Sequence, residues 1–357
     1  MIKVLGLALY GSLAASTRVR MEQYAVGLRE HGIDLHVSSL LGNDYVRRRF
    51  NGKSMAWGNL LQAGAQRLSL LRQSRQFDLA MLYCELFPLM PGLLERKLVG
   101  LPYIYDFDDA FYLRYRLGKK RVLEGLLGHK FDQLMKGAAA ITAGNSMLVD
   151  YASKFSSDVQ LLPTVVDTER YMPVRRALKS RFTVGWIGSP STSTYLPELV
   201  EPLRILGEEG EVEFVVVGGK APKIPGVMIN EISWSEESEV DMINTFDVGV
   251  MPLPDDAWAR GKCAYKLIQY MACGLPVVGS AVGASNEAVT PESGFLVTSP
   301  DDWLSALRRL RDDPKLRFDM GTAGRHRVES IYSLQANLPK LAAIIKNVAI
   351  GGQPCAA

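Results

Sequence analysis

Short apolar runs rich in β-branched residues recur along this chain, and amphipathic stretches with a helical period separate them. Runs of this length favour strands, whereas the segments between them are long enough for helices. Strands that are apolar on both faces and joined by helices are typical of parallel sheets covered by helices on each side. The predicted strands cover residues 2–9, 33–40, 77–85, 101–109, 139–145, 159–167, 182–189, 211–219, 227–233, 248–254, 275–282 and 294–297.

The pattern restarts in the second half of the chain, which indicates two domains of the same class. With 357 residues, the chain exceeds the usual size of one domain. A polar, proline-containing stretch over residues 167–181 separates the two sets of strands and is the expected linker. We predict an α/β fold with two facing, Rossmann-like, doubly wound parallel sheets over residues 1–170 and 171–332. A C-terminal helix and tail over residues 333–357 would close the fold.

Composition narrows the class of function. A net charge of +3 is too small to indicate a nucleic-acid partner. The four cysteines and four histidines lack the paired spacing of a metal site, so we expect free thiols in a reducing cytosol. The first apolar run is expected to be a strand rather than a signal peptide, and no run is long enough to span a bilayer. The sequence therefore predicts a cytoplasmic protein.

Ligand contacts are expected in the loops that follow strands, because doubly wound domains bind ligands beyond the carboxyl ends of their strands. In the loop after the first strand, small residues from Gly11 onward precede Arg18 and Arg20 at an expected helix start. Cations there oppose the helix dipole unless an anion is bound, although a structural role is an equal alternative. The loop lacks G-x-G-x-x-G, so a nicotinamide cofactor is not indicated.

The loop after the strand at 182–189 is a second candidate. It begins with Gly188 and Ser189 and continues with several hydroxyl residues at an expected helix start. Hydroxyls and backbone amides at such a place suit a phosphate, and they also serve as ordinary helix caps.

The segment "GKCAYKLIQYMACG", residues 261–274, predicts a helix over 263–273. At helical spacing Lys262, Lys266 and Gln269 share one face, while the leucine, isoleucine and methionine lie on the buried side. Two lysines near free amides favour an anion, and Gln269 suits a diol such as ribose because an amide both donates and accepts. Solvated lysines on an exposed helix are the alternative.

Acidic residues end one strand of the first half as "YDFDDAF". Strand alternation would point Asp106 and Asp108 the same way, as a carboxylate pair for a divalent metal. A carboxylate here could instead contact a sugar hydroxyl, act as general base on an acceptor alcohol, or cap a helix. Glu85, at the end of the preceding strand, has the same alternatives.

Residues 45–77 carry seven lysines and arginines and no acid, with Phe50, Trp57 and leucines interleaved. This run predicts contact with anionic membrane lipid or with an anionic acceptor, and a solvated helix face is the alternative. The stretch 114–136 is also basic.

Taken together, these motifs resemble a family 4 glycosyltransferase of the GT-B type over nearly the full chain. "REHGIDLHV" and "LPTVVDTERYMP" are similar to the family's first helix with second strand and to its domain-joining segment. The most specific match is to the donor-binding core of the family, which "KLIQYMACGLPVVGSAVGASNEAV" followed by "SGFLV" resembles. "DDPKLRFDMGTAGRHRVESIYS" is similar to the C-terminal helices.

The resemblance implies transfer of a sugar from a nucleotide-diphosphate sugar to a saccharide or lipid-linked acceptor, usually with retention, in cell-surface polysaccharide synthesis. It implies no tightly bound cofactor and no metal held by the protein. The acceptor would meet the first domain, and the predicted catalytic residues are Lys266, Lys262 and Asp109. The residues implied in donor binding are Gly11, Arg18, Gly188, Ser189, Lys262, Lys266, Gln269 and Glu287.

Two departures from the family pattern leave the function open. Gln269 and Gly261 stand where the family commonly has two glutamates eight residues apart. The usual arginine and lysine after the strand at 182–189 are also missing, and Lys262 and Lys266 would replace those cations. The alternatives are an inactive nucleotide-sugar-binding protein and a nucleotide-sugar epimerase.

Overall fold

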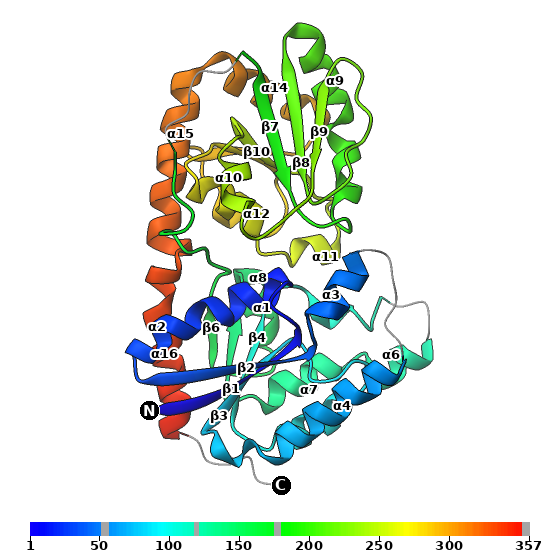
Figure 1. Ribbon diagram of the computed structural model, residues 1–357, viewed down its shortest axis with the longest axis vertical. Coiled ribbons are helices and arrows are strands. Elements are labelled where there is room, and N and C mark those ends of the chain that lie inside the picture. The colour runs from blue at the N-terminus through cyan, green and yellow to red at the C-terminus, as the bar shows by residue number, and fades with distance from the viewer. Residues whose placement is uncertain (51–56, 118–120, 175–179, 352–357) are drawn as a thin grey trace. The chain divides into compact units, whose positions relative to one another are not determined.

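The computed structural model describes residues 1–50, 57–117, 121–174 and 180–351. The backbone divides into two compact units (Figure 1). The first unit comprises Met1–Thr164 with Ala336–Ala357, and the second comprises Val165–Gln335. Residues 165–170 therefore group with the second unit and the chain from Ala336 with the first, whereas the sequence placed one boundary after residue 170 and treated the last helix separately.

The first unit is built on a parallel six-stranded sheet with the order β2-β1-β3-β4-β5-β6. The strands β3 and β4 are buried along their whole length, as expected for a sheet with helices on both faces. The strands are β1 (Ile2–Tyr10), β2 (Ile33–Leu41), β3 (Leu79–Tyr83), β4 (Tyr103–Phe107), β5 (Ala140–Ala143) and β6 (Val159–Leu161).

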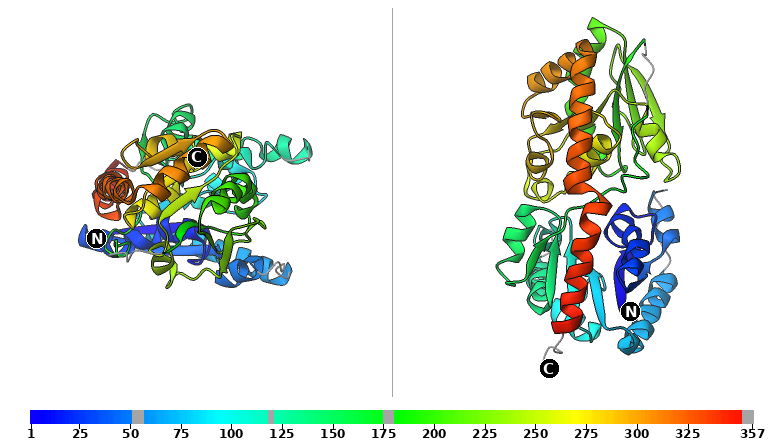
Figure 2. Two further views of the ribbon diagram at one scale, coloured as in Figure 1. Left: turned by 90° about the horizontal axis from the view of Figure 1, so that it is seen from above. Right: turned by 90° about the vertical axis from the view of Figure 1, so that its left-hand side faces the viewer.

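Helices connect these strands, and the last helix of the chain packs on the same unit from Ala336 onward (Figure 2). The α-helices are α1 (Ala15–Arg20), α2 (Ala25–Glu30), α3 (Asn43–Phe50), α4 (Trp57–Arg72), α5 (Gly92–Val99), α6 (Arg121–Leu127), α7 (Lys130–Gly137), α8 (Ser146–Ala152) and α16 (Leu334–Gly351). The 3-10 turns are η1 (Glu22–Tyr24), η2 (Ser74–Gln76) and η3 (Phe111–Leu113).

The second unit has its own parallel six-stranded sheet, with the order β12-β11-β10-β7-β8-β9. Its strands are β7 (Phe182–Ile187), β8 (Val212–Val217), β9 (Met228–Ile232), β10 (Val248–Met251), β11 (Val277–Ser280) and β12 (Gly294–Val297). Its helices are η4 (Ser193–Leu199), α9 (Val200–Glu209), α10 (Glu239–Ile243), α11 (Ala257–Arg260), α12 (Tyr265–Ala272), α13 (Ser285–Ala288), α14 (Pro300–Asp312), α15 (Pro314–Arg327) and the π-helical turn η5 (Val328–Tyr332).

Each of these strands falls on a predicted apolar run, with β1 and β2 one residue longer than predicted. The late helices begin at capping residues. Ser299 and Asp302 form a capping box at α14, and Asp313 caps α15 ahead of Pro314. Within the described ranges, no helix has both the length and the hydropathy needed to cross a bilayer.

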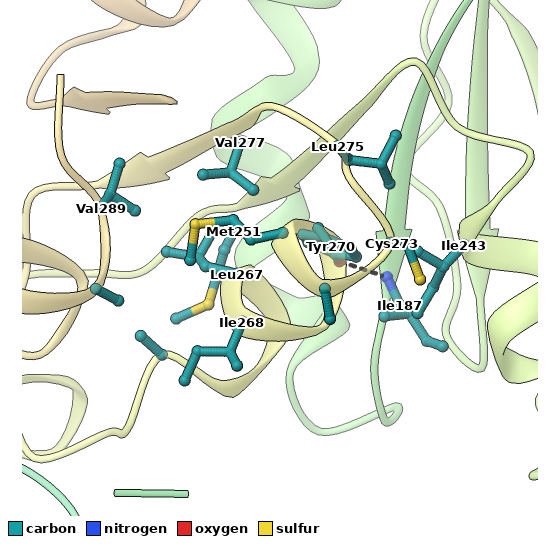
Figure 3. Packing of buried hydrophobic residues seen from close by; sticks show 14 of the residues in the cluster. Ile187, Ile243, Met251, Leu267, Ile268, Tyr270, Cys273, Leu275, Val277 and Val289 are labelled. Carbon is teal, nitrogen blue, oxygen red and sulfur yellow. Dashed lines mark hydrogen bonds between the residues drawn. The ribbon is translucent and has the colours of Figure 1, made fainter. Parts of the chain in front are cut away.

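The core of the second unit forms around α12 (Figure 3). Leu267, Ile268 and Met271 are fully buried, as the helical spacing predicts. Tyr270 is buried beside them, and its hydroxyl accepts a hydrogen bond from the backbone amide of Ile187 over 2.9 Å. This bond ties α12 to the last residue of β7 and thereby fixes where the helix begins relative to the strand end.

Candidate functional site

The carboxyl ends of the strands of the second unit lie along one edge, because all strands of the sheet are parallel. β8 and β9 lie on one side of β7, and β10, β11 and β12 on the other. The direction of winding therefore changes between β7 and β10, which is where doubly wound sheets bind ligands.

Lys266, in the first turn of α12, lies against the end of β7. Its ammonium nitrogen is 5.5 Å from the centre of the Trp186 ring. A Cβ atom on Gly188 would come within 2.7 Å of Cε of Lys266 and 2.6 Å of the Trp186 ring, so no side chain fits there. The glycine thus allows a lysine side chain to lie directly over the first residue after the strand.

A second glycine brings the loop after β8 to the same place. Gly218 has a φ of +77°, which is favourable only for glycine. A Cβ atom there would lie 2.4 Å from the carbonyl oxygen of Gly188 and 2.9 Å from Cβ of Trp234. Gly188, Gly218, Lys266 and Trp234 are therefore gathered at one point of the sheet edge.

Lys262 is not on the same helical face as Lys266, which corrects the sequence prediction. The helix begins at Tyr265 rather than at residue 263, and Lys262 lies in the loop after α11. Ala264, between the two lysines, has a left-handed backbone with a φ of 52°. Such a conformation costs a non-glycine residue about 1 to 2 kcal/mol, so this helix start is held in place by its surroundings.

Gln269 is buried and belongs to a hydrogen-bonded chain. Its Nε2 donates to the hydroxyl of Tyr171 over 3.0 Å, and that hydroxyl donates to Glu239. Nε1 of Trp234 donates to the other carboxylate oxygen of Glu239 over 2.6 Å. Burial, with the nearby Tyr265 and Glu239, holds the pKa of Tyr171 well above its usual value. The predicted ribose contact of Gln269 stays a prediction.

The sequence did not single out Tyr171 or Glu239. Tyr171 lies in the segment that resembles the family's domain-joining region, where nothing marks it as a site residue, and Glu239 stands in no recognisable motif. They come from the segment after β6 and from α10, far from Gln269 along the chain. Only the fold brings the three together.

The loop after β7 leads into the 3-10 helix η4 rather than into an α-helix, and two of its backbone amides are already hydrogen-bonded. The backbone amides of Thr192 and Ser193 both donate to the carbonyl oxygen of Ser189, and a 3-10 turn follows. The hydroxyls of Ser189 and Ser191 are 2.8 Å apart. Gly188 and Ser189 remain predicted donor contacts through their position at the end of β7.

Glu287 lies in α13, in the loop after β11. Its backbone carbonyl accepts from Nη2 of Arg327 over 2.5 Å and from the hydroxyl of Tyr332 over 3.3 Å. These bonds fix α13 on the C-terminal helices. The donor contact expected of the Glu287 carboxylate stays a prediction.

In the first unit, the loop after β1 runs from Gly11 to α1. Asn43, at the start of α3, accepts from the amide of Leu13 over 3.0 Å and donates to the hydroxyl of Ser12 over 2.9 Å. Arg18 Nη1 donates to the carbonyl oxygen of Ser12 over 3.3 Å. Asn43 was not predicted, although its place directly after β2 was a usable signal. Gly11 and Arg18 remain predicted contacts.

Arg18 and Arg20 lie in the last turn of the six-residue α1, not in its first turn as predicted. Arg20 is buried and forms a fork with Asp106, with Nε to Oδ2 at 2.9 Å and Nη2 to Oδ1. Thr142 donates to Oδ1 of the same carboxylate over 2.6 Å. Arg20 is therefore part of the core, and its counter-ion is the Asp106 carboxylate of the protein rather than a bound anion.

This pairing also corrects the metal alternative for Asp106 and Asp108. Both oxygens of Asp106 are taken by Arg20, and Asp108 accepts from the hydroxyl of Tyr83 over 2.6 Å. Within the described ranges, no group of three histidine, cysteine or acidic side chains is placed to hold a metal. The half-buried Asp109 starts the turn before η3, and its predicted role as base stays a prediction.

Glu85 is a structural ion-pair residue. Nζ of the buried Lys130 lies 2.6 Å from Glu85 and 2.8 Å from Glu95, and Arg114 also pairs with Glu85. Burial tends to raise the pKa of Glu85, but Lys130 and Arg114 outweigh it and lower that pKa. For Glu95, burial prevails over Lys130 and raises the pKa.

The basic run at 45–77 is not one continuous surface. Arg47, Arg48 and Arg49 are exposed at the end of α3, whereas residues 51–56 lie outside the described residues. Arg67 is buried and donates to the carbonyl oxygens of Ala8 and Ser38 over 2.8 and 3.0 Å. Burial lowers its pKa to about 10. Arg67 therefore stabilises strands β1 and β2 from within the core and is not part of an exposed basic surface.

Part of this chain matches a known protein family, and stretches of it match individual members of characterised families. Residues 181–313 match the model of the family described as Glycosyl transferases group 1. A GDP-mannose-dependent monoacylated α-(1-6)-phosphatidylinositol monomannoside mannosyltransferase of Corynebacterium glutamicum is 36% identical over 118 residues, 30% of each chain. The capsular polysaccharide biosynthesis glycosyltransferase CapM of Staphylococcus aureus is 25% identical over 180 residues, 45% of this chain and 44% of CapM. The chain thus spans less than half the length of both relatives.

The structure of Anabaena HepE in complex with UDP and glucose has the same fold. The TM-score is 0.71 with 12% identity, covering 97% of this chain and 100% of that chain. The predicted α/β fold of the GT-B type is confirmed, and the resemblance to group 1 glycosyltransferases is confirmed for the segment that the family model matches.

Proposed function

We propose that this chain, whose residues 181–313 match the group 1 glycosyltransferases, transfers a hexose from a nucleotide-diphosphate sugar to a saccharide or lipid-linked acceptor. The observation that carries the proposal is Lys266 lying over Gly188 at the end of β7. A cation at the edge where the winding direction changes is where a diphosphate would be held. The names of the two relatives, a mannosyltransferase and a capsular polysaccharide enzyme, support a role in surface polysaccharide or glycolipid synthesis.

In the proposed reaction, the bond between the anomeric carbon and the diphosphate oxygen breaks, and an acceptor hydroxyl forms the new glycosidic bond. Negative charge develops on the departing diphosphate, and Lys266 with Lys262 stabilises it. Asp109 accepts the proton of the acceptor hydroxyl. We propose retention of configuration on the strength of the family resemblance.

The remaining donor contacts are proposed from their positions. Gly188 and Ser189 follow β7, and Glu287 follows β11, so these three belong to the same sheet edge of the second unit. Gln269 is kept as a ribose contact through its amide oxygen, since Nε2 already donates to Tyr171. Gly11 and Arg18 are proposed to contact the donor from the first unit. No tightly bound cofactor and no metal take part in this proposal.

We further propose that the protein works in the cytoplasm, against the inner face of the membrane. Cys84, Cys263 and Cys273 are buried and lie outside any disulfide, which fits a reducing compartment. The exposed arginines 47–49 of the basic run are the proposed contact with anionic lipid.

The test is a transfer assay on Lys266→Ala, with GDP-mannose and UDP-glucose as donors and lipid extract and oligosaccharides as acceptors. We expect turnover to fall by about 100-fold or more, because the leaving diphosphate loses its main cation. Lys315→Ala, an exposed lysine on α15 of the same unit, is the control and should transfer at the unmodified rate. Equal rates for both variants would refute the assignment of Lys266.

The two alternatives predict different products from the same assay. A binding protein without catalysis would bind UDP or GDP in calorimetry and release no product with any acceptor. An epimerase would change the sugar or release the nucleotide diphosphate without forming a glycoside.

A further inference from the structure

Trp186, the last residue but one of β7, is almost fully buried, with 1% of its surface exposed. It packs in an apolar cluster with Leu196 of η4 and Leu203 of α9. The next residue, Ile187, belongs to a different cluster, the one around α12 (Figure 3). Because successive side chains of a strand point to opposite faces of a sheet, the indole and α12 lie on opposite faces at β7.

Lys266 reaches from one of these faces to the other. It lies in α12, yet its ammonium nitrogen is 5.5 Å from the centre of the Trp186 ring. A Cβ atom on Gly188 would come within 2.7 Å of Cε of Lys266 and within 2.6 Å of two atoms of the indole. The lysine stem therefore passes over Gly188, beyond the end of β7, to the face on which the indole lies.

Two glycines make room for the indole. A Cβ atom on Gly219, in the loop after β8, would come within 2.6 Å of Cζ3 of Trp186, and one on Gly188 would meet Cζ2 and Cη2. All three atoms belong to the six-membered part of the indole, so both glycines lie against the same end of the ring. Burial alone requires only an apolar side chain at this position. The tryptophan adds a flat aromatic face, which an aliphatic residue lacks.

An aromatic face is a favourable place for this ammonium. Lys266 is in the first turn of α12, where the helix dipole disfavours a cation. Tryptophan attracts a cation to its face more strongly than the other aromatic side chains do. The flexible four-carbon stem of a lysine has many conformers. The indole therefore favours the conformer that places the ammonium at the end of β7 before any ligand binds.

We propose that Trp186 is a positioning residue for sugar transfer, whose indole keeps the Lys266 ammonium beside Gly188, ready for the diphosphate of the donor. This inference rests on the proposed function, in which Lys266 stabilises the departing diphosphate. A lysine that is already in place loses less conformational freedom when the anion binds, so the indole raises the affinity for a nucleoside diphosphate. Trp186 acts through Lys266 and is not itself a catalytic residue.

The experiment is a double-mutant cycle on nucleotide affinity, with UDP and GDP titrated by isothermal calorimetry. Trp186→Leu should weaken nucleotide binding by about tenfold, because Lys266 loses its aromatic support. Lys266→Met, which keeps an unbranched stem without the charge, should weaken binding further. Trp186→Leu/Lys266→Met should bind as Lys266→Met does, since the indole then has no lysine to position.

Trp186→Phe separates this role from core packing. Trp186→Phe and Trp186→Leu both leave a cavity and should both lower the melting temperature, but only phenylalanine keeps an aromatic face. Trp186→Phe should therefore lose no more than about threefold in affinity. Should Trp186→Leu fail to fold, Trp186→Phe takes its place in the cycle, where its loss should disappear in the Lys266→Met background.

Trp303→Leu is the matched control for a lost core tryptophan. Trp303 is fully buried in the same cluster, and its Nε1 donates to Glu198 over 3.1 Å. This variant should melt at a lower temperature and bind the nucleotide like the unmodified chain.

Nuclear magnetic resonance measures the contact without a nucleotide. In protein made with carbon-13-labelled lysine, the ε-methylene protons of Lys266 should resonate upfield of those of exposed lysines, because the ring current of an indole shields protons over its face. Lys266→Met assigns the signal, and Trp186→Leu should return it to the ordinary position.

The role of Trp186 is refuted if Trp186→Phe and Trp186→Leu lose affinity equally, if the two single losses multiply in the double variant, or if the upfield shift is absent. Those results leave the effect of Lys266→Met intact. Failure of the proposed function looks different, because the unmodified chain would then bind neither UDP nor GDP, or Lys266→Met would bind them unchanged, while the upfield shift persists.

Discussion

Gln269 donates a hydrogen bond to the hydroxyl of Tyr171, 3.0 Å away, and both side chains are buried. The Tyr171 hydroxyl in turn donates a hydrogen bond to Glu239, which also accepts one from Trp234. The side-chain amide of Gln269 can donate to the neutral hydroxyl of Tyr171. Glu239 is then the only carboxylate in the hydrogen-bonded group formed by Gln269, Tyr171, Glu239 and Trp234.

Tyr171→Phe should destabilise the protein by about 1 to 3 kcal/mol, because Gln269 Nε2 and a Glu239 oxygen would lose a buried partner. Urea unfolding followed by circular dichroism measures the change. Tyr195→Phe is the control, since the Tyr195 hydroxyl makes no hydrogen bond to the described part of the chain. A shift for Tyr171→Phe no larger than for the control would contradict this account of the network.

Asp106→Asn should lower the free energy of unfolding by about 3 to 5 kcal/mol, because the Arg20 guanidinium would be left as a buried charge without a full counter-charge. The exposed pair of Arg29 and Asp34 provides the comparison, with a nitrogen-to-oxygen distance of 3.6 Å. Asp34→Asn should cost at most about 1 kcal/mol. Thermal and urea unfolding of the two variants would show the difference, and equal losses would argue against the buried pair.

The stability of the first unit should depend on pH through Glu85. Its folded pKa lies below the usual value of about 4.3, so its ion pairs contribute stability above that pH and lose it as the pH falls through the lowered pKa. Glu85→Gln should therefore be less stable than the unmodified chain at neutral pH and should lose less stability on acidification.

Glu95 should act in the opposite direction. Its raised pKa means that the folded state holds a proton more tightly, so stability attributed to Glu95 falls as the pH rises from about 4.3 towards the folded pKa. Urea midpoints measured across the acid range for Glu85→Gln and Glu95→Gln would test both signs. Parallel pH profiles for the two variants would contradict the assignment.

Gly188→Ala should weaken binding of UDP or GDP by about tenfold or more, because the new methyl group would push Lys266 away from the end of β7. Isothermal titration calorimetry gives the affinity. Gly210→Ala is the matched change, since its φ of −179° is extended backbone and no atom lies within 4 Å of the added Cβ. If nucleotide affinity were the same in both variants, Gly188 would not be part of the donor site.

The strands, the buried face of α12 and the late helix caps were predictable because each depends on local spacing. An apolar run of five residues or a serine three residues before an aspartate has the same meaning wherever the segment lies in the fold. The start of the helix at Tyr265 was harder to predict from the sequence. Ala264 adopts a left-handed backbone there, and alanine carries no signal for that conformation.

The amino-acid sequence by itself determined two parallel sheets and the segments after strands in which Lys266, Gly188 and Glu287 lie, because periodicity and strand ends are local properties. Only the tertiary structure showed that Arg20 forms an ion pair with Asp106, that Gln269 donates a hydrogen bond to Tyr171, and that Leu89 is exposed to solvent. Each of these outcomes depends on which distant segment burial brings near, and the energy of a buried polar or charged group is set by that partner rather than by its neighbours in sequence.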